Sequence, residues 1–180
     1  MTIDWIRHTS LSIDPILCYG QTDVPVSKNF EREAEQVKQK LDALEHRYDA
    51  SFTSPLSRAT LLADYCGYGD AIRDDRLMEF NFGSWEMRPW YDISDLALGD
   101  ENLWFATWHQ MEIPDGETLQ NMILRVEEFI SSCKEKGYSH IICFCHGGVI
   151  NTAQYITGQI GYDDIFKLTP KHGEIISISH

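Results

Sequence analysis

Hydrophobic residues recur along the chain with two different periods, which together predict alternating helices and strands. In two stretches an apolar side chain returns every third or fourth residue, the spacing of one face of a helix. The first stretch comprises Phe30, Ala34, Val37, Leu41 and Leu44, and the second comprises Leu119, Met122, Ile123, Val126, Phe129, Ile130 and Cys133. We expect two amphipathic helices, the first capped by Ser27 and the second ended by Gly137.

Short apolar runs bounded by turn-forming residues predict the strands, at 3–8, 50–53, 71–74, 141–145 and 174–179. The run at 141–145 is almost continuously apolar, as expected of a buried parallel strand. Because strands and helices alternate, the sequence predicts a three-layer α/β/α sandwich with a mostly parallel central sheet. We expect one domain over residues 1–180. The aromatic-rich stretch 88–114 should form short helices that cover the site as a lid.

Composition narrows the function classes. The 180 residues are 43% hydrophobic and 12% aromatic, which fits one compact domain. The net charge of -13 argues against nucleic acid as a partner. A membrane-spanning or secretory segment is not expected from the hydropathy of the chain, and the cytoplasm is the expected compartment. A monomer and a homodimer are both compatible with the sequence.

The five cysteines do not follow the spacing of a disulfide framework, which agrees with a reducing compartment. Cys143 and Cys145 alternate along a predicted strand, and we interpret them as core residues. A metal site formed by these two cysteines and His146 is the alternative. Paired ligands at the usual zinc spacing are missing, so this alternative is weaker.

Candidate chemistry gathers where three predicted strands end. Arg7 and His8 follow the first strand, His146 follows the strand at 141–145, and Arg58 falls in the first turn of a helix that Ser54 and Pro55 should begin. Ligands of open α/β sheets bind at the carboxyl ends of the strands. Two arginines and two histidines at that edge predict an anion pocket, and phosphate matches guanidinium groups best.

Five segments, in this order, resemble the motifs of the histidine phosphatase superfamily, also called phosphoglycerate-mutase-like. The segments are Ile-Arg-His-Thr at 6–9, Ser-Pro-Leu-Ser-Arg-Ala at 54–59, Leu-Met-Glu-Phe-Asn-Phe-Gly-Ser-Trp-Glu at 77–86, Pro-Asp-Gly-Glu-Thr at 114–118, and Cys-His-Gly-Gly at 145–148. They span nearly the whole chain, and five motifs in order are far more specific than one. The resemblance implies the phosphoglycerate-mutase-like fold and phosphoryl transfer through a phosphohistidine.

Carried over residue by residue, the resemblance makes His8 the nucleophile and Glu79 the general acid. The phosphate pocket would then be formed by Arg7, Arg58, His146 and the helix-start amide of Gly147. Elementary chemistry supports these roles, because a neutral imidazole is a competent nucleophile and adjacent guanidinium groups disfavour its protonation. A bound phosphate favours the protonated carboxyl that a leaving alkoxide requires. No metal or cofactor is expected in the reaction.

Several acidic residues and histidines have other interpretations. Glu86 is the alternative acid, and Glu117 is interpreted as a first-turn charge that complements a helix dipole. The other histidines, His46, His109, His140, His172 and His180, have no informative spacing and are expected to be ordinary surface or core residues.

The chain departs from the family pattern after the first motif. Asp14 stands where many members have an asparagine that contacts the phosphate, and an ionised Asp14 would repel that anion. Either Asp14 points away, or Ser10, Ser12 or Gln21 supplies the missing donor. Asp14 is therefore not counted as a ligand.

The expected substrate is a small phosphorylated metabolite. Mutases of the family are usually longer, so the short chain favours hydrolysis over a mutase. Glu86-Met87-Arg88 and the aromatic stretch resemble the α-ribazole phosphatase branch, which removes the 5′-phosphate of α-ribazole in cobalamin nucleotide-loop assembly. A broad-specificity phosphatase, a phosphoglycerate mutase and a non-catalytic protein that binds a phosphorylated ligand are the alternatives.

Overall fold

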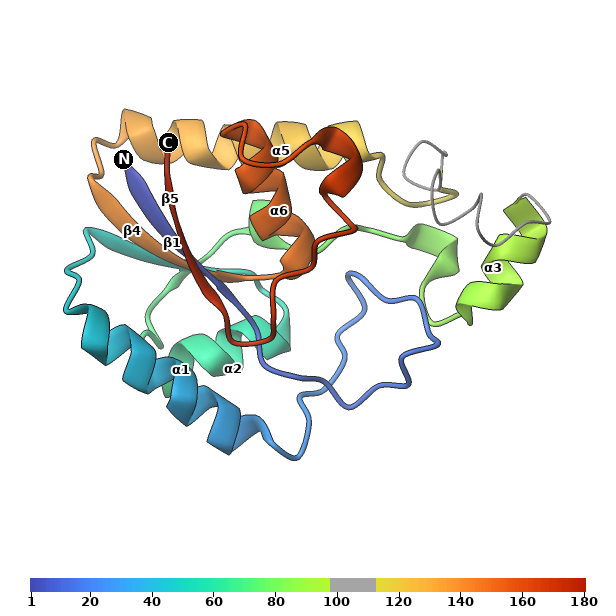
Figure 1. Cartoon of the computed structure of the whole chain (residues 1–180), viewed down its shortest axis with the longest axis horizontal. Coiled ribbons are helices and arrows are strands. Elements are labelled where there is room, and N and C mark those ends of the chain that lie inside the picture. The colour runs from blue at the N-terminus through green and yellow to red at the C-terminus, as the bar shows by residue number, and fades with distance from the viewer. Residues whose placement is uncertain (98–112) are drawn as a thin grey trace.

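A five-stranded sheet forms the centre of the computed structural model, which describes residues 1–97 and 113–180 (Figure 1). The strands lie in the order β3-β2-β4-β1-β5, and only β5 runs antiparallel to its neighbour. Their bounds are β1 Thr2–Arg7, β2 Ala50–Thr53, β3 Ile72–Arg73, β4 His140–Cys145 and β5 Ile175–Ser179. The predicted fold, a mostly parallel sheet between helices, is confirmed.

Helices cover both faces of the sheet. The helices α1 (Phe30–Leu44) and α2 (Ser57–Tyr65) lie on one face, and α5 (Leu119–Glu135) and α6 (Gly147–Ile156) lie on the other (Figure 1). Alternate residues of the central strands divide between the two layers, as the two-residue period of a strand requires. In β1, for example, Trp5 packs in the α5–α6 layer, whereas Ile6 packs in the α1–α2 layer.

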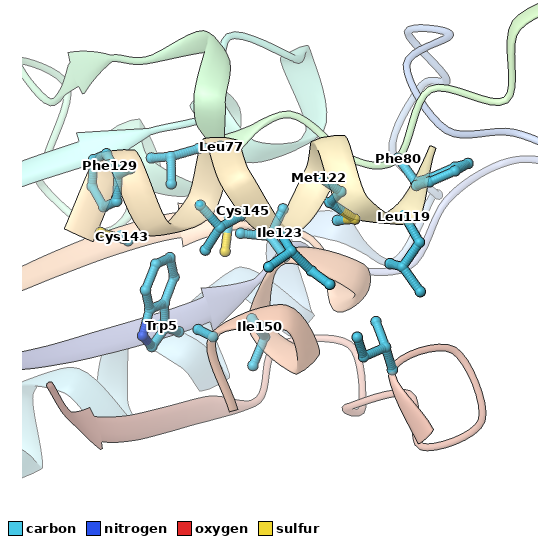
Figure 2. Packing of buried hydrophobic residues seen from close by; sticks show 14 of the residues in the cluster. Trp5, Leu77, Phe80, Leu119, Met122, Ile123, Phe129, Cys143, Cys145 and Ile150 are labelled. Carbon is cyan, nitrogen blue, oxygen red and sulfur yellow. The ribbon is translucent and has the colours of Figure 1, made fainter. Parts of the chain in front are cut away.

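The larger core lies between the sheet, α5 and α6 (Figure 2). Its helical part includes residues of α6 and the predicted stripe of α5, whose seven residues are all buried. Trp5 is completely buried there and meets the edge of Phe129 at a ring-centroid distance of 6.0 Å. Cys143 and Cys145 face this core, and both are free thiols. Their predicted role as core residues is therefore confirmed.

Two helix starts differ from the prediction because the serines expected as caps bond elsewhere. Ser54 does not begin α2, since Pro55 and Leu56 form a bend and the helix starts at Ser57, with Leu56 as its N-cap residue. Ser27 does not cap α1 either, because Asn29 precedes the first helical residue and Ser27 Oγ accepts the Asn29 N–H at 3.1 Å. Arg58 nevertheless lies in the first turn of α2, as predicted.

Part of the expected lid can be followed. Residues Trp90–Ala97 form the helix α3, which projects beyond the sandwich (Figure 1). Trp104, Phe105, Trp108 and His109 lie outside the described residues, so the lid over 88–114 stays a prediction. Among the helices of the described ranges, none combines the length and apolar character needed to cross a membrane.

Candidate active site

Three loops are brought together by hydrogen bonds that continue the sheet beyond its strands. His8 N–H donates to the carbonyl of Cys145 at 3.1 Å, which joins the end of β1 to the end of β4. Ser54 N–H donates to the carbonyl of Phe144 at 2.9 Å, which joins the end of β2 to the same strand. Backbone pairing therefore places the segments after β1, β2 and β4 side by side at one edge of the sheet.

His8 is held as a neutral imidazole with one free nitrogen. The side chain is 2% exposed, and its Nδ1 lies 2.7 Å from the carbonyl oxygen of Thr9. Because a carbonyl only accepts, Nδ1 carries the proton and Nε2 keeps its lone pair. Burial, followed by the charges of Arg58 and Arg7, holds the pKa of His8 well below 6.5. This is the protonation state that a nucleophile at Nε2 requires.

His146 lies beside His8, with 5.2 Å between the ring centroids, and both of its nitrogens are engaged. Arg58 Nε–H donates to His146 Nδ1 at 3.2 Å, so the proton of the ring is on Nε2, which donates to Ser54 Oγ at 2.8 Å. Burial, then Arg58, holds the pKa of His146 well below 6.5. His146 thus fixes the orientation of Arg58, a role that Ser54 supports from the loop after β2.

Arg58 is completely buried at the bottom of the site. Its Nη1 donates to the carbonyl of Thr22 at 2.8 Å, and Nη2 donates to the carbonyl of Gly20. This loop also packs tightly against the backbone of Phe80, which requires glycine at position 20. A Cβ there would lie 1.8 Å from the carbonyl oxygen of Phe80. Carbonyls and a neutral imidazole orient the guanidinium without neutralising it, which leaves its charge for an anion.

Arg7 supplies the second cation. Its Nη1 donates to the carbonyl of Pro170, and its Nε is buried without a hydrogen-bond partner. Burial lowers the pKa of Arg7, an effect that Glu79 opposes, but arginine remains charged at neutral pH. An unpaired buried N–H is costly, and a bound oxyanion would satisfy it.

Glu79 is positioned by backbone amides on both carboxylate oxygens. Oε1 accepts the N–H of Phe80 at 3.0 Å, and Oε2 accepts the N–H of Gly148 in the first turn of α6 at 3.1 Å. A Cβ at position 148 would lie 2.4 Å from Glu79 Oε1, so only glycine permits this approach. The helix start thereby brings the carboxyl group to the same edge of the sheet as His8.

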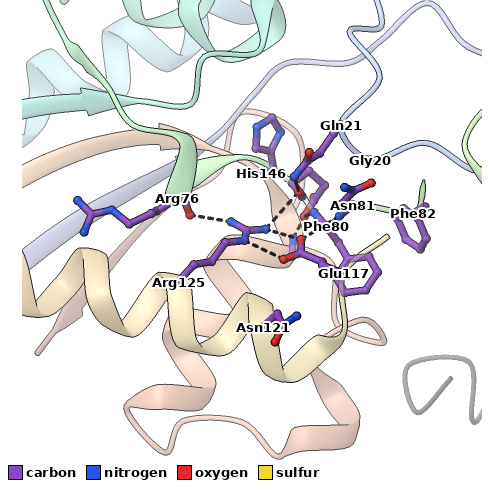
Figure 3. A network of polar contacts seen from close by, with 12 residues as sticks. Gly20, Gln21, Arg76, Phe80, Asn81, Phe82, Glu117, Asn121, Arg125 and His146 are labelled. Carbon is purple, nitrogen blue, oxygen red and sulfur yellow. Dashed lines mark hydrogen bonds and ion pairs between the residues drawn. The ribbon is translucent and has the colours of Figure 1, made fainter. Parts of the chain in front are cut away.

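The sequence did not reveal a polar network around Arg125, in which Glu117 and Arg76 take part (Figure 3) and which reaches the main chain of Glu79. Arg125 on α5 donates from Nη2 to the main-chain carbonyl of Glu79 at 3.2 Å and from Nη1 to the carbonyl of Arg76 at 2.6 Å. Glu117 holds this arginine through two bonds, of 3.0 and 2.8 Å. Glu117 therefore anchors Arg125. The prediction that Glu117 is a first-turn charge was wrong, because α5 begins at Leu119 after Thr118, which caps the helix through a bond to Asn121 N–H.

Glu86, the alternative acid, is occupied by the loop after β1. Its carboxylate accepts the N–H groups of Gln21 at 2.7 Å, Thr22 at 2.5 Å and Phe82 at 3.3 Å, together with the hydroxyl of Thr22. These bonds hold the loop whose carbonyls orient Arg58. Glu86 is thus a structural anchor, and Glu79 is the carboxyl group that lines the cavity.

The cavity between these groups has a volume of about 170 Å³. Its polar lining residues are Arg7, His8, Tyr19, Glu79, Gly148, Asn151 and Thr169, and its apolar ones are Phe82, Trp90, Ile165 and Phe166. Arg58 and His146 lie deeper, where both are fully buried. Gly147 begins α6 beside Arg7, with its Cβ position 3.4 Å from Arg7 Nε.

Asp14 does not take part in the cavity. It is exposed in the loop after β1, and its Oδ1 accepts the N–H of Ile16 at 3.1 Å. Of the suggested substitutes, Ser10 bonds Ser27 and Glu33, and Gln21 bonds the carbonyl of Glu79. The departure at position 14 therefore leaves an Asx-type turn that faces solvent and not a carboxylate that repels phosphate.

His172 also reaches the site, although its spacing in the sequence predicted nothing. Its ring lies 5.3 Å from that of His8, on the segment that leads into β5. Burial and then Arg7 lower the pKa of His172 to about 4. A third neutral imidazole therefore flanks His8. Only the fold could reveal this, because the contact joins residues 164 positions apart.

Together these groups can carry out phosphoryl transfer. A neutral imidazole with a free Nε2, the Arg7 guanidinium and the Glu79 carboxyl group line one small cavity, and the buried Arg58 lies deeper beside them. Phosphoryl transfer requires mainly positioning and neutralisation of the phosphoryl oxygens, with a proton donor for the leaving oxygen. The arrangement therefore offers a nucleophile, an anion pocket and an acid.

Comparison with known proteins agrees with this geometry. Phosphoserine phosphatase 1 of Hydrogenobacter thermophilus is 25% identical over 154 residues, covering 83% of this chain and 72% of its own length. A probable phosphoglycerate mutase of Enterobacter is 30% identical over 116 residues, covering 63% of this chain and 54% of its own length. The crystal structure of the α-ribazole phosphatase from Shigella flexneri superimposes with a TM-score of 0.81 at 25% identity, covering 99% of this chain and 90% of that one.

The family model for the histidine phosphatase superfamily (branch 1) matches residues 6–180, which include all five motifs. A phosphatase-class enzyme is consistent with the names of these relatives and with the site. The chain belongs to the histidine phosphatase superfamily, branch 1.

Proposed function

We propose that the protein is a phosphomonoesterase that works through a phosphohistidine at His8 and that its substrate is α-ribazole 5′-phosphate. The observation that carries the mechanism is the orientation of His8. Its Nδ1 proton is committed to the carbonyl of Thr9, so Nε2 keeps its lone pair, and the charges of Arg58 and Arg7 keep the ring unprotonated. A nucleophile fixed in this way needs no separate base to remove a proton.

The reaction proceeds in two balanced steps. In the first, His8 Nε2 forms a bond to phosphorus while the ester oxygen leaves as the alcohol, taking its proton from Glu79. In the second, water attacks the phosphohistidine, Glu79 takes the proton of the water, and His8 leaves with its lone pair restored. Arg7 and Arg58 bind the phosphoryl oxygens in both steps, which lowers the cost of the charge that develops there.

The remaining walls of the cavity favour an apolar alcohol. Phe82, Trp90, Ile165 and Phe166 contribute apolar surface to the lining, and a flat aromatic ring such as a benzimidazole packs well against aromatic and aliphatic side chains. The structural relative from Shigella, an α-ribazole phosphatase, supports the same substrate.

Charge distinguishes this substrate from the smaller acids. Arg7 is the only lysine or arginine among the described residues that line the cavity, and the sequence of residues 98–112 contains neither type. Phosphoglycerate and phosphoserine carry a carboxylate in addition to the phosphate, and this carboxylate would need a further cation. The relatives named as phosphoserine phosphatase and phosphoglycerate mutase keep these two substrates as the competing function.

A steady-state substrate panel tests the proposal. Phosphate release is measured from α-ribazole 5′-phosphate, 3-phosphoglycerate, phosphoserine, a sugar phosphate and p-nitrophenyl phosphate, with the His8→Ala protein as the blank. We expect kcat/KM for α-ribazole 5′-phosphate to exceed the others by about 100-fold, or roughly 2.7 kcal/mol of transition-state discrimination. Comparable values would indicate a broad-specificity phosphatase, and no His8-dependent release would favour a non-catalytic binding protein.

A further inference from the structure

A second cluster of histidines lies at the opposite end of the sheet from the active site. Asp4 is in β1, His140 is the first residue of β4, and His46 follows α1. The ligand-type atoms of these three side chains all lie within 4.8 Å of one another, and in the described ranges no other group of three or more His, Cys, Asp or Glu residues meets this criterion. The sequence predicted no role for either histidine.

Both imidazoles point at one oxygen of a buried carboxylate. His46 Nδ1 lies 2.8 Å and His140 Nε2 lies 3.2 Å from Asp4 Oδ2, and the two ring centroids are 4.7 Å apart. Asp4 is completely buried, and the hydroxyl of Tyr48 donates to the same oxygen at 2.7 Å. The second oxygen, Oδ1, accepts the hydroxyl of Ser177. The Asp4 carboxylate is therefore fixed from both sides.

Hydrogen bonding alone does not account for His140. Its Nε2 is a buried nitrogen that makes no hydrogen bond of acceptable geometry, although it is aimed at Asp4 Oδ2. That oxygen is already shared by Tyr48 and His46. An orphaned ring nitrogen next to a carboxylate and a second imidazole is an arrangement that a cation would satisfy, because each nitrogen could then offer a lone pair.

The donor set selects the kind of cation. Two imidazole nitrogens and one carboxylate oxygen are ligands of zinc, with bonds of about 2.0–2.2 Å and a fourth position for water or another oxygen. Tetrahedral zinc with these bonds separates its ligand atoms by roughly 3.3 Å, so the present spacings of 2.8 and 3.2 Å need only a small opening. His46 can provide it, because it is on an exposed loop.

The surroundings resemble those of a prepared site. A carboxylate that is oriented by a neighbouring donor binds metal better than a free one, and Ser177 holds Asp4 in this way. Asp49 anchors the backbone of the third ligand by accepting the N–H of His140 at 3.0 Å. The net charge of -13 attracts cations to the molecule.

We propose that Asp4, His46 and His140 form a zinc-binding site that is separate from the active site. Its three ligands join β1, β4 and the segment after α1, so a bound ion would hold together elements far apart in the sequence. The site does not depend on the phosphatase reaction, and its occupation stabilises the fold without taking part in turnover.

Titration of the metal-free protein with zinc chloride tests the site. Protein is treated with EDTA, freed of the chelator by gel filtration, and titrated in a calorimeter; cobalt chloride gives a parallel visible spectrum. We expect one saturable ion per chain, a cobalt spectrum typical of four or five ligands, and a rise in Tm with zinc. His46→Gln, which changes an exposed residue and leaves the core intact, should weaken binding by at least about 10-fold.

Two controls separate this site from other histidines. His180→Gln makes the same substitution outside the cluster, and His8→Ala removes an imidazole from the active site; both proteins should bind zinc as the wild type does. Asp4→Asn and His140→Gln should lose binding, with circular dichroism confirming that each is folded. Absence of saturable binding to the wild-type protein, equal binding to His46→Gln, or loss in His8→Ala would each overturn the proposal.

Discussion

The two ends of the same pair of strands carry histidine clusters of opposite electrostatic character. At their carboxyl ends, β1 and β4 lead into His8 and His146, which lie among the guanidinium groups of Arg7 and Arg58. Toward their amino ends, the same strands carry Asp4 and His140. There the buried Asp4 carboxylate lies against the imidazoles of His140 and His46. Identical side chains on identical strands are therefore prepared for opposite ligands.

The neighbours of each imidazole determine this difference. The two buried rings beside the arginines stay neutral: His8 keeps a free Nε2, and His146 orients Arg58. The guanidinium charge, which no carboxylate neutralises, is left for an anion. Beside Asp4, the rings face a negative charge, which suits a cation. Histidine alone is thus a weak functional signal, and the charge that accompanies it is the informative part.

The largest expected effect is the loss of the nucleophile. His8→Ala should lower phosphatase kcat by roughly 10⁴-fold or more, because no other group can form the covalent intermediate. Ser177→Ala, in β5 opposite Asp4, should leave kcat unchanged. Steady-state rates of the two proteins, measured side by side, check this pair. A His8→Ala enzyme with near wild-type activity would remove the distinction between the two ends.

Glu79→Gln should produce the next largest effect, and its size should depend on the leaving group. For an alkyl phosphate kcat/KM should fall by roughly 10²–10⁴-fold, because the alkoxide leaves without its proton. For p-nitrophenyl phosphate the fall should be much smaller, since nitrophenolate needs little protonation. Glu86→Gln is the matched control. Equal losses on both substrates would mean that Glu79 is not the acid.

A smaller loss is expected from Gly148→Ala. The added methyl would lie 2.4 Å from Glu79 Oε1, so the carboxyl group must move away from the cavity. A displacement of about 1 Å costs on the order of 10²-fold in kcat. Gly161→Ala controls for the substitution type, because Gly161 has an ordinary φ of -79° and an added Cβ would meet only the Asp164 carboxylate, at 3.2 Å. Unchanged alkyl phosphatase activity in Gly148→Ala would show that the position of Glu79 is not critical.

The smallest expected effect is on the pH dependence of folding stability, which should differ between the two histidine clusters. The folded pKa values of His8 and His146 lie below the unfolded value of 6.5, so the unfolded chain binds more protons and stability falls as pH drops below 6.5. Each histidine contributes at most about 1.4 kcal/mol per pH unit. The Asp4 contribution, by contrast, is present above 3.8 and is lost as pH falls through the lowered folded pKa.

Urea unfolding between pH 7.5 and 5 measures these contributions. His146→Gln should flatten the dependence in this range by the share of one histidine, whereas Asp4→Asn should lower stability by a nearly constant amount. A slope that His146→Gln leaves unchanged would contradict the lowered pKa values at the active-site end.

Much of the fold could be predicted from the sequence because the signals for its helices and strands lie within short stretches of the chain. The period of α5 and the apolar run of β4 follow from residues close together in the chain, and they indicated the correct elements. The predicted start of α2 was wrong because Ser54, a good capping residue by type, instead accepts a hydrogen bond from His146, which follows β4. The capping propensity of a residue does not determine where a helix begins when a distant side chain supplies a better hydrogen-bond partner.

The residues of the active site likewise divide into those with a local sequence signal and those without one. Motifs indicated Arg7, His8, Arg58, Glu79 and His146, which the fold brings to one edge of the sheet. Arg125 and His172 were missed, since each reaches the site through a contact that has no local signature. The same holds for the cluster around Asp4, where three segments meet only in the folded chain.

Trapping the phosphoenzyme tests the central claim most directly. Glu79→Gln enzyme is mixed with p-nitrophenyl phosphate, since its good leaving group permits the first step while the missing base slows the second. Rapid quenching and peptide mass spectrometry then locate the phosphoryl group. We predict a burst of one nitrophenolate per enzyme and an acid-labile, alkali-stable phosphate on His8. No burst and no label, or a label on His146 or His172, would contradict the account.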